Sequence, residues 1–237
     1  MDLPSHRRST AARLAPRQSR SERTRRKILD AAGAILSRGP IDAVPVVEIA
    51  RRAGVSVGGF YARFPGKDDL LHAFDEDLHA RARATLAATM DAARFEGRGV
   101  AAVVGAYLGM TASFFEENRA VLRQVVSRIR DGGDPEFVRR VREFNLAAHG
   151  RLHDLLLARR AEIGHEDPEA AIDLATLSAS AALREAILFA DRKLNRSGVV
   201  DGARLVRELT RAYCAYLGAT PPDGTPRRRA GRKSGRS

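Results

Sequence analysis

The chain has 237 residues, and its 44% hydrophobic content excludes a wholly disordered protein while allowing one large or two smaller domains. A single cysteine, Cys214, excludes an intrachain disulfide and favours a reducing compartment such as the cytoplasm. The polar, arginine-rich N-terminus lacks the apolar core of a secretory signal. The longest uncharged run, residues 100–115, is too short to span a bilayer, so we expect a buried helix there.

The net charge of +12 is concentrated at the two ends of the chain. Residues 1–27 hold nine Lys and Arg against two acidic residues, and residues 220–237 hold six against one. Because both ends are rich in Ser, Pro, Gly and Arg, residues 1–20 and 220–237 are predicted to be disordered basic segments. Such segments either contact phosphates of a nucleic acid or simply aid solubility, and the second alternative is favoured for the C-terminal one.

The first predicted helix spans about residues 21–38 and ends at Gly39-Pro40. A second helix follows directly, because apolar residues recur there at the spacing of one helical face, namely Val46, Ile49, Ala50 and Ala53. Gly54 is suited to the left-handed conformation that ends such a helix, and Ser56 is suited to cap the next one. In that third helix Phe60 and Phe64 share the inner face. Two short helices joined in this way predict a helix-turn-helix, which places its second helix in the DNA major groove.

Three sequence blocks occur in register over about 50 residues around this motif. They read T-R-x-x-I-L-x-A-A from Thr24 to Ala32, E-I-A-x-x-A-G-V-S from Glu48 to Ser56, and F-Y-x-x-F-x-x-K-x-x-L-L from Phe60 to Leu71. In this order they resemble the TetR/AcrR family of bacterial transcriptional regulators. The resemblance covers roughly residues 21–81, and the rest of the chain is similar only in length and helical pattern.

The resemblance implies a DNA-binding surface made of residues from the first four helices. The residues expected to contribute are Arg25, Val47, Ser56, Val57, Gly58, Gly59, Tyr61, Arg63 and Lys67. Ser56 is expected to cap the recognition helix, Tyr61 and Lys67 to contact phosphates, and Arg63 to reach a guanine edge. The chain departs from the family where Val44 and Pro45 replace a usual Ser or Thr, and where Val57-Gly58-Gly59 replaces a more polar triplet. Few side chains are therefore expected to contact bases.

Helical periodicity continues to the end of the chain, with no strand pattern and no internal repeat. The expected helices span residues 67–95, 100–117, 119–130, 135–163, 168–194 and 200–217. Asp134-Pro135 and Asp167-Pro168 are typical helix starts, with Asp at the cap and Pro in the first turn. The prediction is an all-α protein of about nine helices, with a helix-turn-helix domain at residues 21–66 and a helical effector-binding and dimerisation domain at residues 67–219.

The resemblance also implies a homodimer and a small-molecule effector bound in the helical body. The expected dimer surface lies on helices 168–194 and 200–217, although the apolar residues of these helices could instead cover their own core. A ligand cavity is predicted near the uncharged helix, lined by Tyr107, Met110, Phe114, Phe115, Gln124, His149 and His153. The same side chains at helical spacing are also compatible with an ordinary core.

The leading hypothesis is a ligand-responsive repressor that binds a palindromic operator as a homodimer in the cytoplasm, associated with the nucleoid. The first alternative is an architectural or weakly specific DNA-binding protein driven by the basic segments. The second is a helical enzyme or metal-binding protein that uses His149 and His153, which are spaced to share one helix face. Because the sequence contains no recognisable motif for catalysis, phosphate or metal, no enzyme activity, no cofactor and no metal site is expected.

Overall fold

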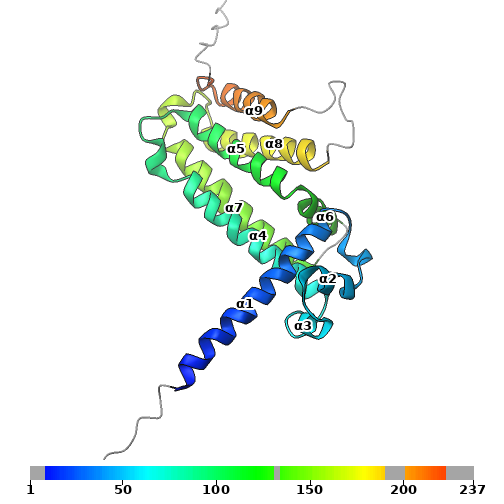
Figure 1. Ribbon diagram of the computed structural model, residues 1–237. Helices are drawn as coiled ribbons and strands as arrows, with labels where there is room; N and C mark the ends of the chain where they lie inside the picture. Colours follow the sequence, from blue (N-terminus) through cyan, green and yellow to red (C-terminus); the bar gives the residue numbers. More distant parts are fainter. Residues whose placement is uncertain (1–8, 131–133, 190–200, 223–237) are drawn as a thin grey trace, which may run out of the picture.

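The structure is a computed structural model that describes residues 9–130, 134–189 and 201–222. Within these residues it is all-α, as predicted, with nine α-helices and three short 3₁₀ turns (Figure 1). The α-helices are α1 (Ser9–Leu36), α2 (Val46–Ala53), α3 (Val57–Tyr61), α4 (Lys67–Thr89), α5 (Val100–Glu117), α6 (Arg119–Arg130), α7 (Pro135–Leu157), α8 (Pro168–Leu188) and α9 (Gly202–Leu217). The 3₁₀ turns are η1 (Ile41–Ala43), η2 (Ala92–Phe95) and η3 (Arg160–Glu162).

Four predicted helix boundaries were wrong. Helix α1 begins at Ser9 rather than near residue 21, so residues 9–20 are helical and not disordered. This segment contains alanine, leucine and arginine, which are good helix formers, and it continues a helix that packing already stabilises. The helices predicted to end at residues 95 and 163 end earlier, at Thr89 and Leu157, and each is followed by a separate 3₁₀ turn. Helix α8 ends at Leu188, and residues 190–194 of its predicted range lie outside the described residues.

Two predicted helix starts are confirmed in atomic detail. The carboxylate of Asp134 accepts a hydrogen bond from the backbone N–H of Glu136, and that of Asp167 accepts one from the N–H of Ala170. In both helices a proline follows the cap, where its missing N–H would have had no partner inside the helix. These two caps fix the directions in which α7 and α8 cross the body.

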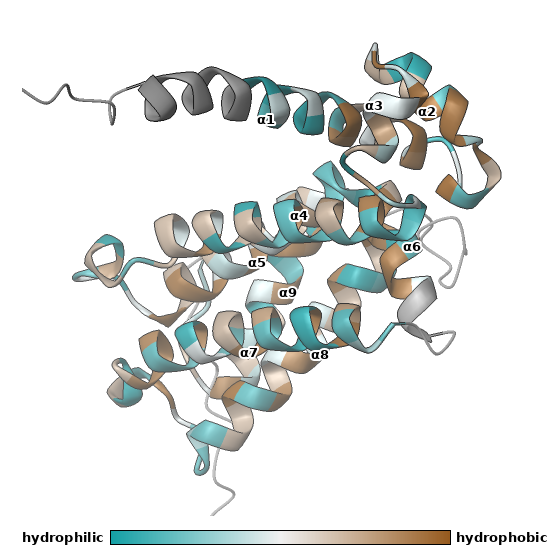
Figure 2. Cartoon of the chain, turned by 90° about the horizontal axis from the view of Figure 1, so that it is seen from below, coloured by the Kyte–Doolittle hydropathy of each residue, from teal (hydrophilic) through white to brown (hydrophobic). Residues whose placement is uncertain are grey.

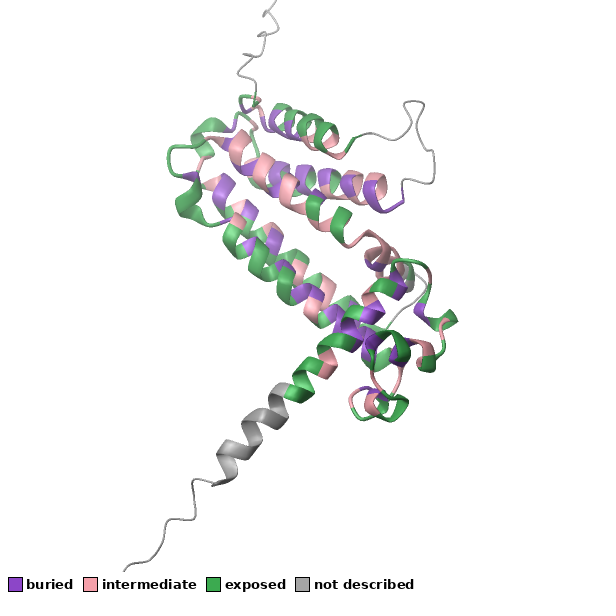
Figure 3. Ribbon diagram, viewed as in Figure 1, coloured by how far each residue is buried: buried purple, intermediate pink, exposed green. Residues whose placement is uncertain are grey.

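Helices α1 to α3 and the first half of α4 form a head with its own hydrophobic core. Buried side chains of these helices meet where α1 crosses α2 and α4, as the purple cluster in Figure 3 shows. In Figure 2 the hydrophobic residues of α1 and α2 likewise come together where the two helices meet. Val121 of α6 and Phe137 of α7 complete this core, so the head packs directly on the body.

The body consists of the second half of α4 together with α5 to α9. Helix α5 packs against α4, α7, α8 and α9, and its uncharged sequence therefore lies within a protein core. The hydroxyl of Tyr213 on α9 lies 2.6 Å from that of Thr176 on α8, which joins two buried polar groups. Among the described helices, none is both long and apolar enough to cross a membrane.

Candidate functional site

The turn between α2 and α3 has the geometry that its sequence predicts. Gly54 adopts a left-handed conformation with φ 65°, and its N–H donates to backbone carbonyls at the end of α2. The Oγ of Ser56 accepts a hydrogen bond of 3.0 Å from the N–H of Gly59, which confirms Ser56 as the cap of α3. A Cβ at position 59 would lie 3.1 Å from that Oγ, so a glycine leaves room for the capping contact.

Two aromatic residues hold α3 against the rest of the head. Phe60 is fully buried, and its ring centroid lies 5.8 Å from that of Phe64 and 5.4 Å from that of Tyr61. An isolated helix of five residues is not stable in water, so this packing holds α3 in place. The arrangement leaves the opposite face of α3 open to solvent.

The open face of the helix-turn-helix is apolar and weakly charged. Val47 of α2 and Val57 and Tyr61 of α3 are among the large hydrophobic residues that the structure leaves exposed. Gly58 lies beside them and is also exposed. We call these four residues the recognition surface. Its only polar side-chain group is the phenolic hydroxyl of Tyr61, and it carries no charged or amide side chain.

Two predicted DNA-contacting residues, Arg63 and Lys67, make hydrogen bonds within the head. The guanidinium of Arg63, which is half-buried, donates to the carbonyl oxygens of Gly59 at 3.2 Å and Ser21 at 3.5 Å. Arg63 comes two residues after the end of α3, and its side chain lies against the backbone of α3 and α1. The Nζ of Lys67 donates to the carbonyl of Asp42 at 3.0 Å. Arg25 is half-buried on α1.

A pair of arginines on α2 was not singled out from the sequence. The carboxylate of Glu48 accepts hydrogen bonds from Arg51 at 2.7 and 2.8 Å and from Arg52 at 2.7 Å. These bonds lower the pKa of Glu48 to about 2, so the carboxylate is ionised at neutral pH. The trio leaves α2 with one excess positive charge next to the turn. An acidic residue followed by arginines three and four positions later was the available sequence signal.

A cavity of about 240 Å³ lies within the body between α4, α5, α6, α7 and α8. This volume is slightly below the range of about 300–1,000 Å³ that is usual for small-molecule sites. Of the seven residues predicted to line a ligand cavity, five lie in its wall, namely Tyr107, Met110, Phe114, Phe115 and His149. The cavity wall is mostly apolar, and burial raises the pKa of the Tyr107 hydroxyl.

The other two predicted cavity residues lie elsewhere, so those predictions were wrong. The side-chain amide of Gln124 donates to the carbonyls of Leu36 at 2.9 Å and Gly39 at 3.0 Å, at the C-terminal end of α1. Gln124 therefore caps a helix of the head, since those carbonyls have no partner within α1. His153 is half-buried on α7 but does not line the cavity, although it is one turn from His149.

Several polar residues of the cavity wall were missed from the sequence. They come from α4, α7 and α8, and they are Asp75, His79, Asn145 and Arg184. Asp75 and His79 lie on the buried face of α4, four residues apart and interleaved with Leu71, Phe74 and Leu78. A carboxylate at apolar helical spacing was the signal that would have identified Asp75 as an interior residue.

His149 gives the cavity a pH-dependent contribution to stability. Burial lowers the pKa of its imidazole, and the nearby Asp173 carboxylate partly offsets this effect. Because the folded pKa is below the unfolded value of about 6.5, the unfolded chain takes up the proton first as the pH falls. Stability from neutral His149 is therefore present above pH 6.5 and is lost as the pH falls through the lowered pKa.

We expect His149→Gln to reduce the loss of stability between pH 7.5 and pH 5. The measurement is the free energy of unfolding of both proteins from urea titrations at the two pH values. His153→Gln is the matched control, because this neighbour lies outside the cavity wall. An identical pH dependence of the wild type and His149→Gln would contradict the assignment.

The described residues show no group suited to bind a metal, and the only cysteine is buried. Among the residues that the structure describes, no three histidine, cysteine or acidic side chains are grouped to hold a metal ion. Cys214 is buried in the body core, and burial raises the pKa of its thiol to about 11. A thiol that stays protonated at neutral pH is a poor nucleophile and a poor redox sensor.

The sequence of the helix-turn-helix region matches a known protein family. Residues 28–74 match the family model described as "Bacterial regulatory proteins, tetR family". A search of the curated protein sequences finds no match.

Three solved structures illustrate the likeness of fold. SmeT, the repressor of the Stenotrophomonas maltophilia multidrug efflux pump SmeDEF, is 18% identical with a TM-score of 0.57, covering 81% of this chain and 88% of its own. A tetR-family transcriptional regulator from Streptomyces coelicolor is 18% identical with a TM-score of 0.60, covering 83% and 81%. A TetR transcription regulator from Haloarcula marismortui is 17% identical with a TM-score of 0.60, covering 82% and 96%.

Proposed function

We propose that this chain is a ligand-responsive transcriptional repressor, because residues 28–74 match the model of the tetR family of bacterial regulatory proteins. In this proposal two copies bind a palindromic operator, and a small molecule in the cavity of the body changes their affinity for DNA. The observation that carries it is the helix-turn-helix itself. Its α3 is capped by Ser56, held from behind by Phe60 and left open along the recognition surface.

Contacts with DNA would come mainly from shape and from phosphates. The open face of α3 carries Val57, Gly58 and Tyr61. Val57 and Gly58 allow the backbone to approach DNA closely, and Tyr61 can donate a hydrogen bond to a phosphate, but none of the three is a typical side chain for reading bases. Lys67, at the start of α4, is placed to reach a phosphate as well. Arg63 is the candidate for a guanine edge, and it would have to exchange its hydrogen bonds to Gly59 and Ser21 for the base.

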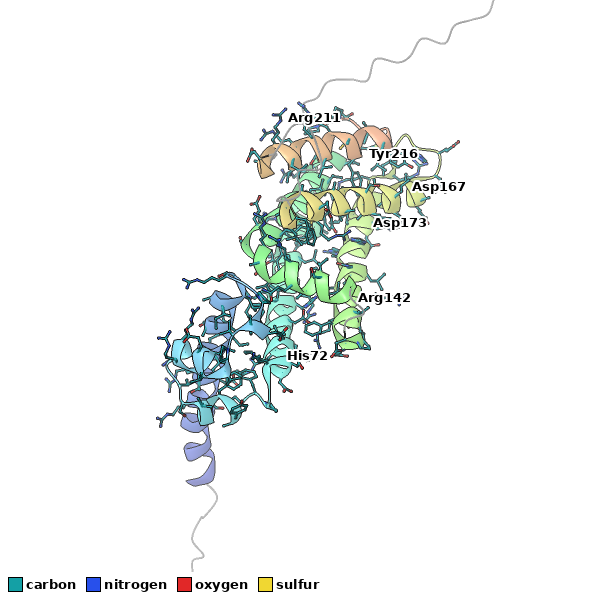
Figure 4. The ribbon with its side chains drawn as sticks, turned by 90° about the vertical axis from the view of Figure 1, so that its right-hand side faces the viewer. His72, Arg142, Asp167, Asp173, Arg211 and Tyr216 are labelled. Carbon is teal, nitrogen blue, oxygen red and sulfur yellow. The ribbon has the colours of Figure 1, made fainter. Side chains whose placement is uncertain are left out.

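The outward faces of α8 and α9 support a homodimer. Leu174 and Leu177 of α8 and Tyr216 of α9 are exposed, whereas other apolar residues of the predicted surface, such as Leu183 and Tyr213, are buried in the body core. Exposed acidic residues on α8 are Glu169 and Asp173, and exposed arginines on α9 include Arg204 and Arg207. Arg211 of α9 pairs with Glu208 of the same helix. Figure 4 shows Asp167 at the start of α8, Asp173 on α8, and Tyr216 and Arg211 on α9. A two-fold contact of α8 with the partner's α9 would pair opposite charges.

Selection of bound sequences from a random DNA pool, using the full chain, tests the proposal. We expect a palindromic consensus whose half-sites are one helical turn apart. Arg63→Ala should relax the preference at one base pair of each half-site, costing about 1–3 kcal/mol there, whereas Tyr61→Ala should weaken all sequences together. Binding without any consensus, lost on removal of residues 1–20 and 220–237, would favour the architectural alternative.

Leu174→Glu is expected to convert the homodimer to a monomer, because each interface would bury two added carboxylates on an apolar face. Leu174 does not line the cavity. Operator affinity should fall by at least about a hundredfold, since the two heads would no longer bind as one unit. Sedimentation at micromolar concentration and operator titration measure the two effects. Leu146→Glu on α7 is the matched control, because Leu146 and Leu174 are both exposed leucines, at 63% and 51%. Equal dissociation of both variants, or a monomeric wild type, would contradict the proposed surface.

A further inference from the structure

The wall of the cavity contains a buried carboxylate with one unused oxygen. The side chain of Asp75 is 1% exposed. Its Oδ2 accepts a hydrogen bond of 2.6 Å from the Nε of Arg140, but no residue within the described parts of the chain donates a hydrogen bond to its Oδ1. Leaving a buried charged oxygen without a donor is costly, and such an atom usually has a partner.

The adjacent histidine does not supply that donor. The Nδ1 of His79 lies 2.9 Å from the backbone carbonyl of Asp75 and 3.2 Å from its Oδ1. Both oxygens can only accept, so Nδ1 carries a proton. The shorter contact of that nitrogen is to the carbonyl, and Oδ1 receives no hydrogen bond. In a neutral ring the other nitrogen, Nε2, is an acceptor. The Oδ1 of Asp75 therefore remains a buried acceptor without a donor at this end of the cavity.

The charge on Asp75 is only partly balanced by Arg140. The guanidinium of Arg140 also donates to the carboxylate of Glu136 at 3.0 Å, and its Nη2 lies 2.8 Å from the Nδ1 of His72. One cation is thus shared between two carboxylates. Arg139 also pairs with Glu136, but it is about half exposed and contributes less inside the body. A second positive group at Asp75 would meet a favourable potential.

The rest of the cavity sets the shape of its ligand. Aromatic and aliphatic side chains make up most of the wall, among them Phe114, Phe115, Phe144 and Met110. Aromatic faces also favour a nearby cation. Among the described residues of this wall Arg184 of α8 is the one arginine, and it is suited to donate to an acceptor elsewhere on the ligand.

We propose that the cavity takes a small, largely apolar molecule carrying a protonated amine or amidine, whose N–H group donates to Oδ1 of Asp75. This inference rests on the proposed function, because it names the effector class of the same site. A modest rotation of the Asp75 carboxylate keeps one oxygen on Arg140 and turns the other toward the cavity. Since Asp75 belongs to α4, which follows the helix-turn-helix directly, the amine would bind at the helix that joins the body to the head.

Three probes of the same size test the chemistry on the unmodified protein. They are phenylbutylamine, phenylbutanol and phenylbutyric acid, titrated calorimetrically into the full chain at neutral pH. The amine should bind roughly ten- to a hundredfold more tightly than the alcohol, as expected for a hydrogen bond to a charged group, and the acid should bind most weakly. Tightest binding of the acid would overturn the proposal and indicate Arg184 as the dominant group. Equal binding of all three would overturn it as well.

Asp75→Asn tests whether the Asp75 carboxylate binds the amine. The asparagine can still accept from Arg140 through its oxygen, while its NH₂ replaces Oδ1 and turns an acceptor into a donor. Affinity for phenylbutylamine should fall roughly ten- to a hundredfold, and affinity for phenylbutyric acid should rise relative to it. Asp154→Asn makes the same change at an exposed position of α7 and should leave the ranking unchanged. An unchanged ranking in Asp75→Asn would overturn the assignment, and the wild-type ranking decides it if this variant does not fold.

Failure of this inference can be distinguished from failure of the proposed function. Calorimetry reports probe binding without DNA, whereas sequence selection reports operator binding without a probe. A clear operator consensus combined with a preference for the acid would keep the regulator and reject the amine. Amine binding that depends on Asp75, without any DNA consensus, would keep the site and reject the regulator.

Discussion

Replacing Phe60 with alanine is expected to lower the free energy of unfolding by about 3–5 kcal/mol and to abolish operator binding. Phe60 is fully buried and contacts the rings of Tyr61 and Phe64, so its removal leaves a cavity beneath a helix of five residues. Without that packing α3 has little intrinsic stability, and the recognition surface loses its fixed orientation. Urea unfolding and operator titration measure the two effects.

The control is Val57→Ala, which removes an exposed side chain from the same helix. We expect it to change stability by less than about 0.5 kcal/mol and DNA affinity only moderately. If Phe60→Ala kept full operator affinity while folded, α3 would not be the helix that binds DNA.

Replacing Arg140 with methionine is expected to destabilise the protein by about 3–5 kcal/mol, because it leaves the Asp75 carboxylate buried without its counter-ion. The side chains of Arg140 and Asp75 are 11% and 1% exposed, so solvent cannot compensate for the lost pair. The change is measured by urea unfolding at neutral pH.

The adjacent arginine provides the control. Arg139 also pairs with Glu136, but its side chain is 54% exposed, and Arg139→Met should cost at most about 1 kcal/mol. Combining Arg140→Met with Asp75→Leu should recover most of the lost stability, because both charges are then gone. Equal effects of the two arginine substitutions would show that burial of the Asp75 pair does not matter.

The helix-turn-helix could be predicted from the sequence because its determinants are local. Gly54 ends α2, Ser56 caps α3 and Phe60 faces inward, and each role depends on neighbours within a few positions along the chain. The apolar half of the cavity could also be predicted, since an uncharged helix too short to span a bilayer has to be covered by other helices. Both predictions needed only helical periodicity and capping rules.

Long-range contacts could not be predicted in the same way. Gln124 was expected in the cavity because its helix is close to it, but its amide faces α1, which is more than eighty residues earlier in the chain. Arg63 was expected to point outward, whereas it lies against the backbone of Gly59 and Ser21. Asp75 was missed because its partner, Arg140, is 65 residues away and nothing in local sequence indicates the pair.

The hydrogen bonds of Gln124 connect the middle of α6 to the C-terminal end of α1. Leu122, Val125 and Val126, on either side of Gln124, line the cavity, so α6 touches the cavity with one face and holds the head with another. Two such bonds resist separation by about 1–3 kcal/mol. A ligand that displaces α6 is therefore expected to shift the end of α1 as well, since the two hydrogen bonds join them.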